Sequence, residues 1–197
     1  MDTKLIVEFM GVLTGAVCVL LAVRENIWNW PIGITNNIIY FVIFWRSKLY
    51  ADACLQLVYI TISIYGWWKW LHKDASKHEL TPTRIREKWG YAALAAGTAI
   101  ATVAMYFVLH RFTDSNVPLG DAFTTALSLT AQFLLSRKLI ENWIVWIIAD
   151  VIYIGLYCYK GLFQTAGLYA IFIVLCVMGY RQWTKSMNES KAAAAVA

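Results

Sequence analysis

The sequence predicts an all-α membrane protein with seven transmembrane helices. Of its 197 residues 60% are hydrophobic and only 15% are charged, and the apolar residues form a series of long runs whose pattern is repeated within the chain. A soluble domain carries more charge than this, and a helix that crosses a bilayer core needs roughly 17–25 residues. Ten Trp and eleven Tyr residues suit the aromatic belts at membrane surfaces.

Seven apolar runs account for the predicted spans. The second and fifth runs are short and polar, and a strict hydropathy threshold would miss them. The fourth run is apolar all round, as expected of a linker between two halves, and the sixth carries an acid at its middle. In chain order the predicted spans are Leu5–Val23, Pro31–Trp45, Ala51–Leu71, Trp89–His110, Asp121–Leu135, Trp143–Tyr159 and Leu162–Tyr180.

The distribution of basic residues predicts the orientation of these spans. Five of the seventeen Lys and Arg residues fall on one side of the membrane and twelve on the other, so the positive-inside rule places the N-terminus outside and the C-terminus in the cytoplasm. The longest connection contains Thr81-Pro82-Thr83, a helix-start signal. The Ala-rich segment after Lys191 is interpreted as a frayed tail without function.

Several classes of function are disfavoured. The net charge of +5 comes from short loops between apolar runs, so a role with nucleic acid is not expected. No cysteine or histidine spacing matches a metal site, and the sequence lacks a catalytic triad and a phosphate loop. We therefore expect no cofactor, no metal and no enzymatic activity. The four cysteines, Cys18, Cys54, Cys158 and Cys176, are interpreted as small buried hydrophobic residues rather than disulfides.

The chain contains an internal repeat with an offset of 113 residues, which superposes Asn29-Trp30 on Asn142-Trp143. Matches at Leu and Ala arise by chance in apolar sequences. Matches at Asn-Trp, Gly and Trp that share a single offset are much rarer by chance. The other matched pairs are Tyr40 with Tyr153, Leu49 with Leu162, Ala53 with Ala166, Leu55 with Leu168, Gly66 with Gly179 and Trp70 with Trp183.

The repeat predicts a 3+1+3 arrangement of helices. Four predicted spans lie between matched positions, so the two triple-helix repeats are parallel and a linker helix joins them. Parallel repeats are an architecture of transporters whose substrate site lies between the repeats near the bilayer midplane. The predicted parts are a first bundle at 1–72, a cytoplasmic loop and linker helix at 73–111, a second bundle at 112–183 and a cytoplasmic tail at 184–197.

Polar and aromatic side chains follow one face of several predicted spans. On the third span this face contains Asp52, Gln56, Tyr59, Ser63, Gly66 and Trp70, at intervals of three and four residues. Asn37 on the second span corresponds to Asp150 on the sixth. An acid at the centre of a bilayer costs roughly 2.5–3.5 kcal/mol on insertion scales and usually faces a cavity, a partner or a pathway.

These faces predict a binding site for a flat, polar ligand, which can be a cation, because aromatic faces attract cations and amides bond hydroxyls. The candidate residues are Trp30, Asn37, Asp52, Gln56, Tyr59, Trp143, Trp146, Asp150 and Tyr153. The alternative is that the polar groups only join helices to one another. Asp52, near the end of a span, is the weaker of the two acids because it can be solvated.

Two sets of segments resemble the PnuC family of bacterial nicotinamide riboside transporters. The first is Trp28-Asn29-Trp30-Pro31-Ile32-Gly33 with Asn36-Asn37 and the run LYADACLQLVYITISIYGWWKW. The second is Asn142-Trp143-Ile144-Val145-Trp146 with Asp150 and the run YKGLFQTAGLYAIF, which is similar to the C-terminal repeat of the family. Together they cover most of the chain, although the linker helix and both termini are not distinctive.

The resemblance implies a homotrimeric protein of the bacterial cytoplasmic membrane, with a fold related to the SWEET sugar transporters. It implies uptake of nicotinamide riboside by facilitated diffusion, with trapping by a cytoplasmic kinase. In this hypothesis Trp143, Trp146 or Tyr153 stacks on the pyridinium, Asp150 offsets its charge, and the amide side chains bond the carboxamide and ribose. Those amides are Asn36, Asn37 and Gln56.

Two alternatives to riboside uptake remain at this point. Relatives within the family carry thiamine, riboflavin or deoxynucleosides, so the resemblance does not by itself fix the substrate. The Trp143/Trp146 pair resembles the motif of the riboside branch and favours that ligand. A non-transporting membrane receptor or assembly subunit is the alternative from another class, and coupling to protons or sodium is left open by the acid at Asp150.

Overall fold

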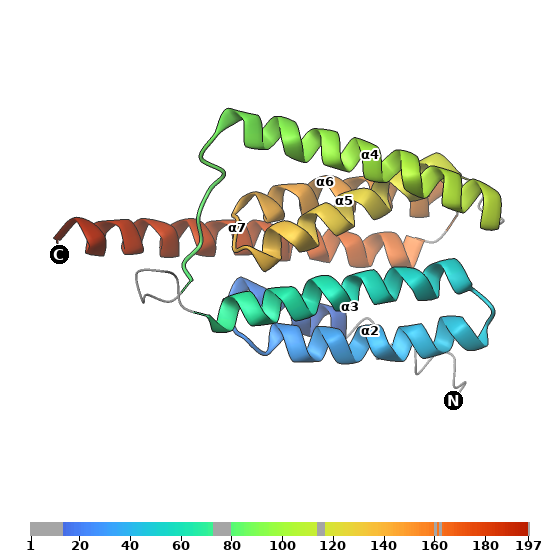
Figure 1. Cartoon of the computed structure of the whole chain (residues 1–197), viewed down its shortest axis with the longest axis horizontal. Helices are drawn as coiled ribbons and strands as arrows, with labels where there is room; N and C mark the ends of the chain where they lie inside the picture. Colours follow the sequence, from blue (N-terminus) through green and yellow to red (C-terminus); the bar gives the residue numbers. More distant parts are fainter. Residues whose placement is uncertain (1–13, 73–79, 114–116, 160, 162, 197) are drawn as a thin grey trace. The chain divides into compact units, whose positions relative to one another are not determined.

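The computed structural model describes residues 14–72, 80–113, 117–159, 161 and 163–196 (Figure 1). This part of the chain is helical apart from turns, loops and one isolated β-bridge, which confirms the predicted all-α class. The first helix is Thr14–Val23. The helices that follow are α2 (Asn29–Arg46), α3 (Tyr50–Leu71), α4 (Lys88–Phe112), α5 (Pro118–Ser136), α6 (Glu141–Tyr159) and α7 (Phe163–Val196).

The second to sixth predicted spans correspond closely to helices α2 to α6. Residues 5–13 of the first span lie outside the described part of the chain. Helices α4, α6 and α7 are long and apolar enough to cross a bilayer. Large apolar side chains such as Ile100, Phe107 and Val174 are exposed on the helices, as expected where lipid replaces water.

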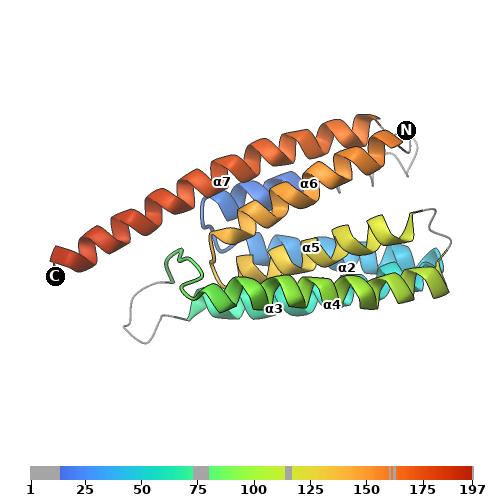
Figure 2. The ribbon, with the colours of Figure 1, turned by 90° about the horizontal axis from the view of Figure 1, so that it is seen from above.

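Helix α7 is much longer than the predicted seventh span. The predicted span ends at Tyr180, and the segment after Lys191 was predicted to be a frayed tail, whereas the helix continues without a break to Val196. Figure 2 shows α7 running beside α6 and projecting beyond it toward the C-terminus. The prediction of a frayed tail was wrong because alanine is the strongest helix former and Lys185 pairs with Glu189 one turn away.

The chain divides into two compact units, Met1–Leu80 and Thr81–Ala197. Within the first unit α2 packs along α3 (Figures 1 and 2). Within the second unit α4 packs on α5, α5 on α6 and α6 on α7. The linker helix α4 therefore groups with the second unit, where the hydroxyls of Thr98 and Thr130 lie 2.9 Å apart across the α4–α5 contact.

Each unit contains a tryptophan seated on a glycine of the neighbouring helix. In the first unit the Trp30 ring packs against Gly66, and a Cβ atom added to that glycine would lie only 2.3 Å from the ring. The Trp30 and Trp70 rings pack edge to face, with their centroids 5.3 Å apart. In the second unit the Trp143 ring packs against Gly179, where an added Cβ atom would lie 2.5 Å from the ring. The Trp143 and Trp183 ring centroids are 5.3 Å apart, again edge to face. The two clusters contain matched residues of the 113-residue repeat.

The backbone follows the same repeat. Glu25 and Lys138, which are 113 residues apart, both have left-handed φ angles, of 54° and 52°. Lys48 and Gly161 form a second matched pair with φ angles of 61° and 72°. Such conformations are uncommon for residues other than glycine, so their recurrence at one offset extends the repeat from the sequence to the turns between helices.

A strap before α4 is attached to the turn between α5 and α6. The Thr83 backbone N–H donates to the Lys138 carbonyl at 3.0 Å, and the Ile140 N–H donates to the Thr83 carbonyl at 2.9 Å. The Glu141 carboxyl oxygen Oε1 accepts from the Ile85 N–H and from the Tyr91 hydroxyl, at 3.2 and 3.0 Å. Thr81-Pro82-Thr83 therefore forms this strap and does not begin a helix, which starts only at Lys88.

We expect Gly179→Ala to lower the free energy of unfolding by about 1–3 kcal/mol, because its methyl group overlaps the Trp143 ring and forces the core to repack. Gly66→Ala should behave alike in the first unit. Gly167→Ala, on the same helix as Gly179 but with open space around it, is the control and should be neutral or gain up to about 1 kcal/mol. Thermal unfolding in detergent compares them. Equal melting temperatures for the two α7 variants would contradict the packing role of Gly179.

Tyr91→Phe removes one of the two donors to the Glu141 carboxyl group. Loss of a hydrogen bond to a buried charged group costs about 1.5–3 kcal/mol, so the variant should melt at a lower temperature. Tyr159→Phe is the matched control, since that side chain is exposed at the end of α6. If both variants melt together, the hydrogen bond from Tyr91 to Glu141 contributes nothing measurable to stability.

Candidate functional site

The predicted site residues fall on three helices. Helix α2 carries Trp30, Asn36 and Asn37, helix α3 carries Asp52, Gln56 and Tyr59, and helix α6 carries Trp143, Trp146, Asp150 and Tyr153. Three of these ten side chains are buried and the others are half-buried. The buried ones are Trp30, Trp143 and Asp150, at 1%, 2% and 3% exposure. The structure thus places the six residues of α2 and α3 in the first unit and the four of α6 in the second.

Asp150 is held between α6 and α7. Its Oδ2 accepts a hydrogen bond from the Cys176 thiol at 3.8 Å, and both side chains are buried. Within the described residues Asp150 forms no ion pair with Lys, Arg or His. Buried charges are normally paired with an opposite charge, and the Asp150 carboxylate has only one weak hydrogen-bond donor instead.

A group of stacked tyrosines lies one turn from Asp150 on the same helix. The ring of Tyr153 lies 6.1 Å from Tyr157 on α6 and 4.8 Å from Tyr169 on α7, and Tyr157 and Tyr169 are 5.3 Å apart. The Tyr153 hydroxyl also lies 3.4 Å from Ser128 Oγ on α5. Helices α5, α6 and α7 therefore bring together aromatic faces and hydroxyl groups near the carboxylate.

In the first unit, Asn36 is partly engaged. Its Oδ1 accepts a hydrogen bond from the Thr14 hydroxyl at 3.1 Å, which joins the first helix to α2 and leaves the Asn36 amide N–H groups as donors. Tyr40 and Phe44 stack at 5.7 Å, at the positions that match Tyr153 and Tyr157 in the repeat. Gln56 stands at the position that matches Tyr169, so the third ring of the cluster is replaced by an amide.

The two matched tryptophans each retain an unused donor. The indole N–H groups of Trp30 and Trp143 are buried and find no acceptor among the described residues. A buried donor without a partner costs about 1–3 kcal/mol. Both tryptophans therefore contribute to packing through their rings, and their N–H groups remain available to an acceptor such as a ligand oxygen or a water molecule.

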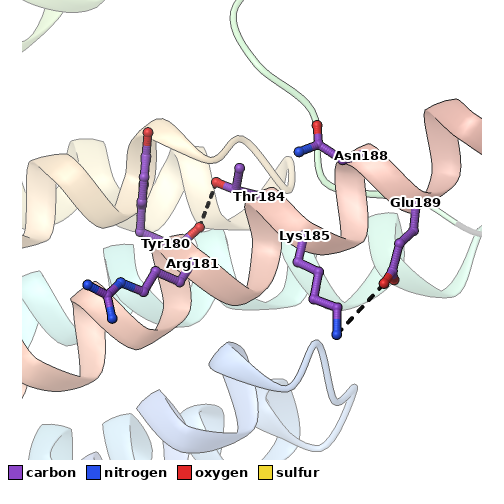
Figure 3. A pocket seen from close by; sticks show the side chains of 6 residues that line it. All are labelled: Tyr180, Arg181, Thr184, Lys185, Asn188 and Glu189. Atoms are coloured by element: carbon purple, nitrogen blue, oxygen red, sulfur yellow. Dashed lines mark hydrogen bonds and ion pairs between the residues drawn. The ribbon is translucent and has the colours of Figure 1, made fainter.

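A shallow hollow on the polar part of α7 is separate from these residues. Figure 3 shows its six lining side chains, all from α7, with the Thr184 hydroxyl donating to the Tyr180 carbonyl and Lys185 paired with Glu189. Arg84 of the strap donates to the Tyr180 hydroxyl at 2.9 Å. The hollow is thus a feature of the helix end, and no residue predicted for the substrate site lines it.

Sequence reasoning missed Cys176, which it treated as a buried hydrophobic residue. The signal was present, because the repeat pairs Cys176 with Ser63, and Ser63 had been placed on the polar face of the third span. Tyr169 was also missed, since its repeat partner is Gln56. All four cysteine thiols are free, but Cys54 and Cys158 are exposed, so the prediction that the cysteines are buried was wrong for these two. In the described ranges no group of three or more His, Cys, Asp or Glu side chains is arranged to hold a metal.

Residues 5–185 match the family described as nicotinamide mononucleotide transporters. The chain belongs to this family. Its members are membrane transporters, so the chain is a transporter and not an enzyme, and the resemblance to the PnuC family is confirmed.

Three relatives of this transporter are transporters of vitamins or vitamin precursors. The nicotinamide riboside transporter PnuC of Escherichia coli (strain K12) is 25% identical, over 93% of this chain and 87% of the relative. The riboflavin/roseoflavin transporter RibM of Streptomyces davaonensis is 24% identical, over 93% and 87%. The nicotinamide riboside transporter PnuC of Neisseria mucosa is 26% identical, over 91% and 72%.

A solved structure shares the fold of this transporter. The crystal structure of the vitamin B3 transporter PnuC matches with a TM-score of 0.71 and 23% identity, covering 91% of this chain and 80% of that one. The helical arrangement of the described residues is therefore that of a known transporter fold.

The two tryptophans of α6 should differ in their effect on stability. Trp143→Ala removes a buried ring from the Gly179–Trp183 contact and should cost about 3–5 kcal/mol of unfolding free energy. Trp146→Ala serves as the comparison, because Trp146 is half-buried and should cost clearly less. Thermal unfolding without ligand measures both. A larger loss for Trp146→Ala would contradict the assignment of Trp143 as the packing residue.

Proposed function

We propose that the chain takes up nicotinamide riboside across the bacterial cytoplasmic membrane by facilitated diffusion. The observation that carries this proposal is the family match over residues 5–185, joined by relatives named nicotinamide riboside transporters. The riboside combines a flat pyridinium cation, a carboxamide and a hydroxylated sugar. A carboxylate without a cation beside stacked tyrosines, as in the second unit, suits such a ligand.

The chemistry of the helices favours the riboside over the mononucleotide named in the family description. A phosphate monoester adds about −1.5 to −2 charges at neutral pH, and a binding site for it needs Lys, Arg or helix N-termini. Helices α5 and α6 contain no Lys or Arg, and α6 carries the acid Asp150. The phosphate of a mononucleotide would therefore be repelled where the pyridinium of a riboside is attracted.

The proposed roles of the side chains follow from their chemistry. Asp150 offsets the charge of the pyridinium, while Trp146 and Tyr153 offer aromatic faces to it. The indole N–H groups of Trp30 and Trp143, which have no acceptor among the described residues, are donors for ligand oxygens. The remaining proposed contacts, to the carboxamide and the ribose, come from Asn36, Asn37, Asp52, Gln56 and Tyr59.

The proposed architecture has seven spans in a 3+1+3 order, with α4 as the linker. Two bundles of three helices would rock and expose the substrate alternately to each side of the membrane, without ion coupling. The matched Trp–Gly clusters and the matched left-handed turns support a duplicated bundle. In this proposal the N-terminus is outside and the C-terminus cytoplasmic, the chain forms a homotrimer, and a cytoplasmic riboside kinase traps the product.

Riboflavin is the second candidate substrate. RibM of Streptomyces davaonensis is a riboflavin/roseoflavin transporter and is as similar to this chain as PnuC of Escherichia coli, over the same share of both proteins. Riboflavin is flat and hydroxylated, like the riboside, but it is uncharged. The charge of the ligand therefore distinguishes the two candidates more clearly than its shape.

Calorimetry on the purified transporter tests the substrate. We expect micromolar or tighter binding of nicotinamide riboside, with weaker or undetectable binding of riboflavin, thiamine and nicotinamide mononucleotide. Asp150→Ala should weaken riboside binding at least tenfold, because a charge partner is lost. Glu189→Ala, which removes an exposed acid at the end of α7, is the control and should not change the affinity. Tighter binding of riboflavin than of the riboside would move the chain to the other branch.

A further inference from the structure

The pair formed by Asp150 and Cys176 has a neutral counterpart in the other half of the chain. Subtracting the repeat offset of 113 residues converts Asp150 into Asn37 and Cys176 into Ser63. Both positions of the pair are polar in each copy, and Ser63 and Cys176 are both buried, at 2% and 4% exposure. At this pair of positions the two copies therefore differ in charge, because Asp150 is a carboxylate and Asn37 is a neutral amide.

The surroundings of this carboxylate supply little compensation for its charge. Asp150 is 3% exposed, and among the described residues its partner is the Cys176 thiol, with no Lys, Arg or His in an ion pair. A thiol is a weak donor compared with a hydroxyl or an amide. An ionised carboxylate in such surroundings gains a charge partner when a cationic ligand binds beside it.

The thiol has a geometric role as well. Cys176 on α7 contacts Oδ2 of Asp150 on α6, so it fixes the carboxyl group at the α6–α7 contact without neutralising it. One turn along α6, Tyr153 stacks with Tyr169 of α7 at 4.8 Å. The same two helices thus hold a charge and an aromatic surface next to each other, and these are the two features by which proteins bind a flat cation.

We propose that Asp150 and Cys176 form a charge filter through which the transporter selects cationic over neutral ligands of the same shape. Asp150 is the specificity-determining residue, and Cys176 is a positioning residue that acts through it. The inference rests on the proposed function, and it names the two residues that give the transporter its preference for a cationic ligand. At this position of the repeat only the second copy carries a charge, so the cationic end of the ligand binds at the second unit.

The test uses two ligands that differ in charge and hardly in shape. Nicotinamide riboside carries one positive charge on its pyridinium ring, and its 1,4-dihydro form has the same ribose and carboxamide but no charge. Calorimetry on the full-length protein in detergent measures both affinities. We expect the natural chain to bind the cation about 100-fold more tightly, which corresponds to about 2.8 kcal/mol.

Substitutions of Asp150 and Cys176 then show which of the two residues produces the preference for the cation. Asp150→Asn keeps the shape of the side chain and removes its charge, so the two affinities should fall within about threefold of each other. Cys176→Ala should lower the preference for the cation to about tenfold, and Cys176→Ser, which restores a donor, should recover it. Cys158→Ala removes an exposed cysteine of α6 and is the control, with no expected change.

The outcomes separate this inference from the function on which it rests. A natural chain that binds neither ligand overturns the proposed function, and the filter with it. A natural chain that binds both ligands equally, or an Asp150→Asn variant that keeps the full preference, overturns the filter and leaves riboside transport standing. If the Asn variant does not purify as a folded protein, the Ala and Ser variants of Cys176 decide, because a purely structural thiol would change both affinities equally.

Discussion

Within each half of this transporter, a contact between a tryptophan ring and a facing glycine holds two neighbouring helices together. Trp30 lies against Gly66 and Trp143 against Gly179, where no larger residue fits without displacement. Close approach of this kind is the usual basis of helix association in a membrane, because lipid is as apolar as a leucine side chain and offers no hydrophobic driving force. These two contacts bring α2 close to α3 and α6 close to α7, and the other side chains of each helix pair pack around them.

The repeat explains how one fold supports both a scaffold and a site. The tryptophan contacts and the left-handed turns are the same in both copies, so the positions that set helix packing have been retained. The copies differ at Asn37 and Asp150, where the amide becomes a carboxylate, and at Gln56 and Tyr169, where the amide becomes an aromatic ring. Chemistry that recognises a flat cation is thus concentrated in the second unit, on a backbone shared with the first.

Much of the fold could be predicted from the sequence, and the errors have physical causes. Apolar runs located helices α2 to α6 to within a few residues of their bounds, and a single offset revealed the repeat. The extent of α7 was missed because hydropathy reports where a span ends but not where a helix ends. The strap at Thr83 was missed because its bonds join residues more than fifty positions apart. Cys176 was missed because a cysteine in an apolar run has no polar signature of its own, and its repeat match with the polar Ser63 was not used.

The most direct test of riboside transport is the movement of labelled nicotinamide riboside into liposomes that contain the purified protein. Facilitated diffusion predicts that the label equilibrates across the membrane, that proton and sodium gradients leave its rate unchanged, and that excess unlabelled riboside inside the liposomes accelerates its entry. Two results would contradict this mechanism. The first is absence of protein-dependent flux, and the second is accumulation above equilibrium driven by an ion gradient.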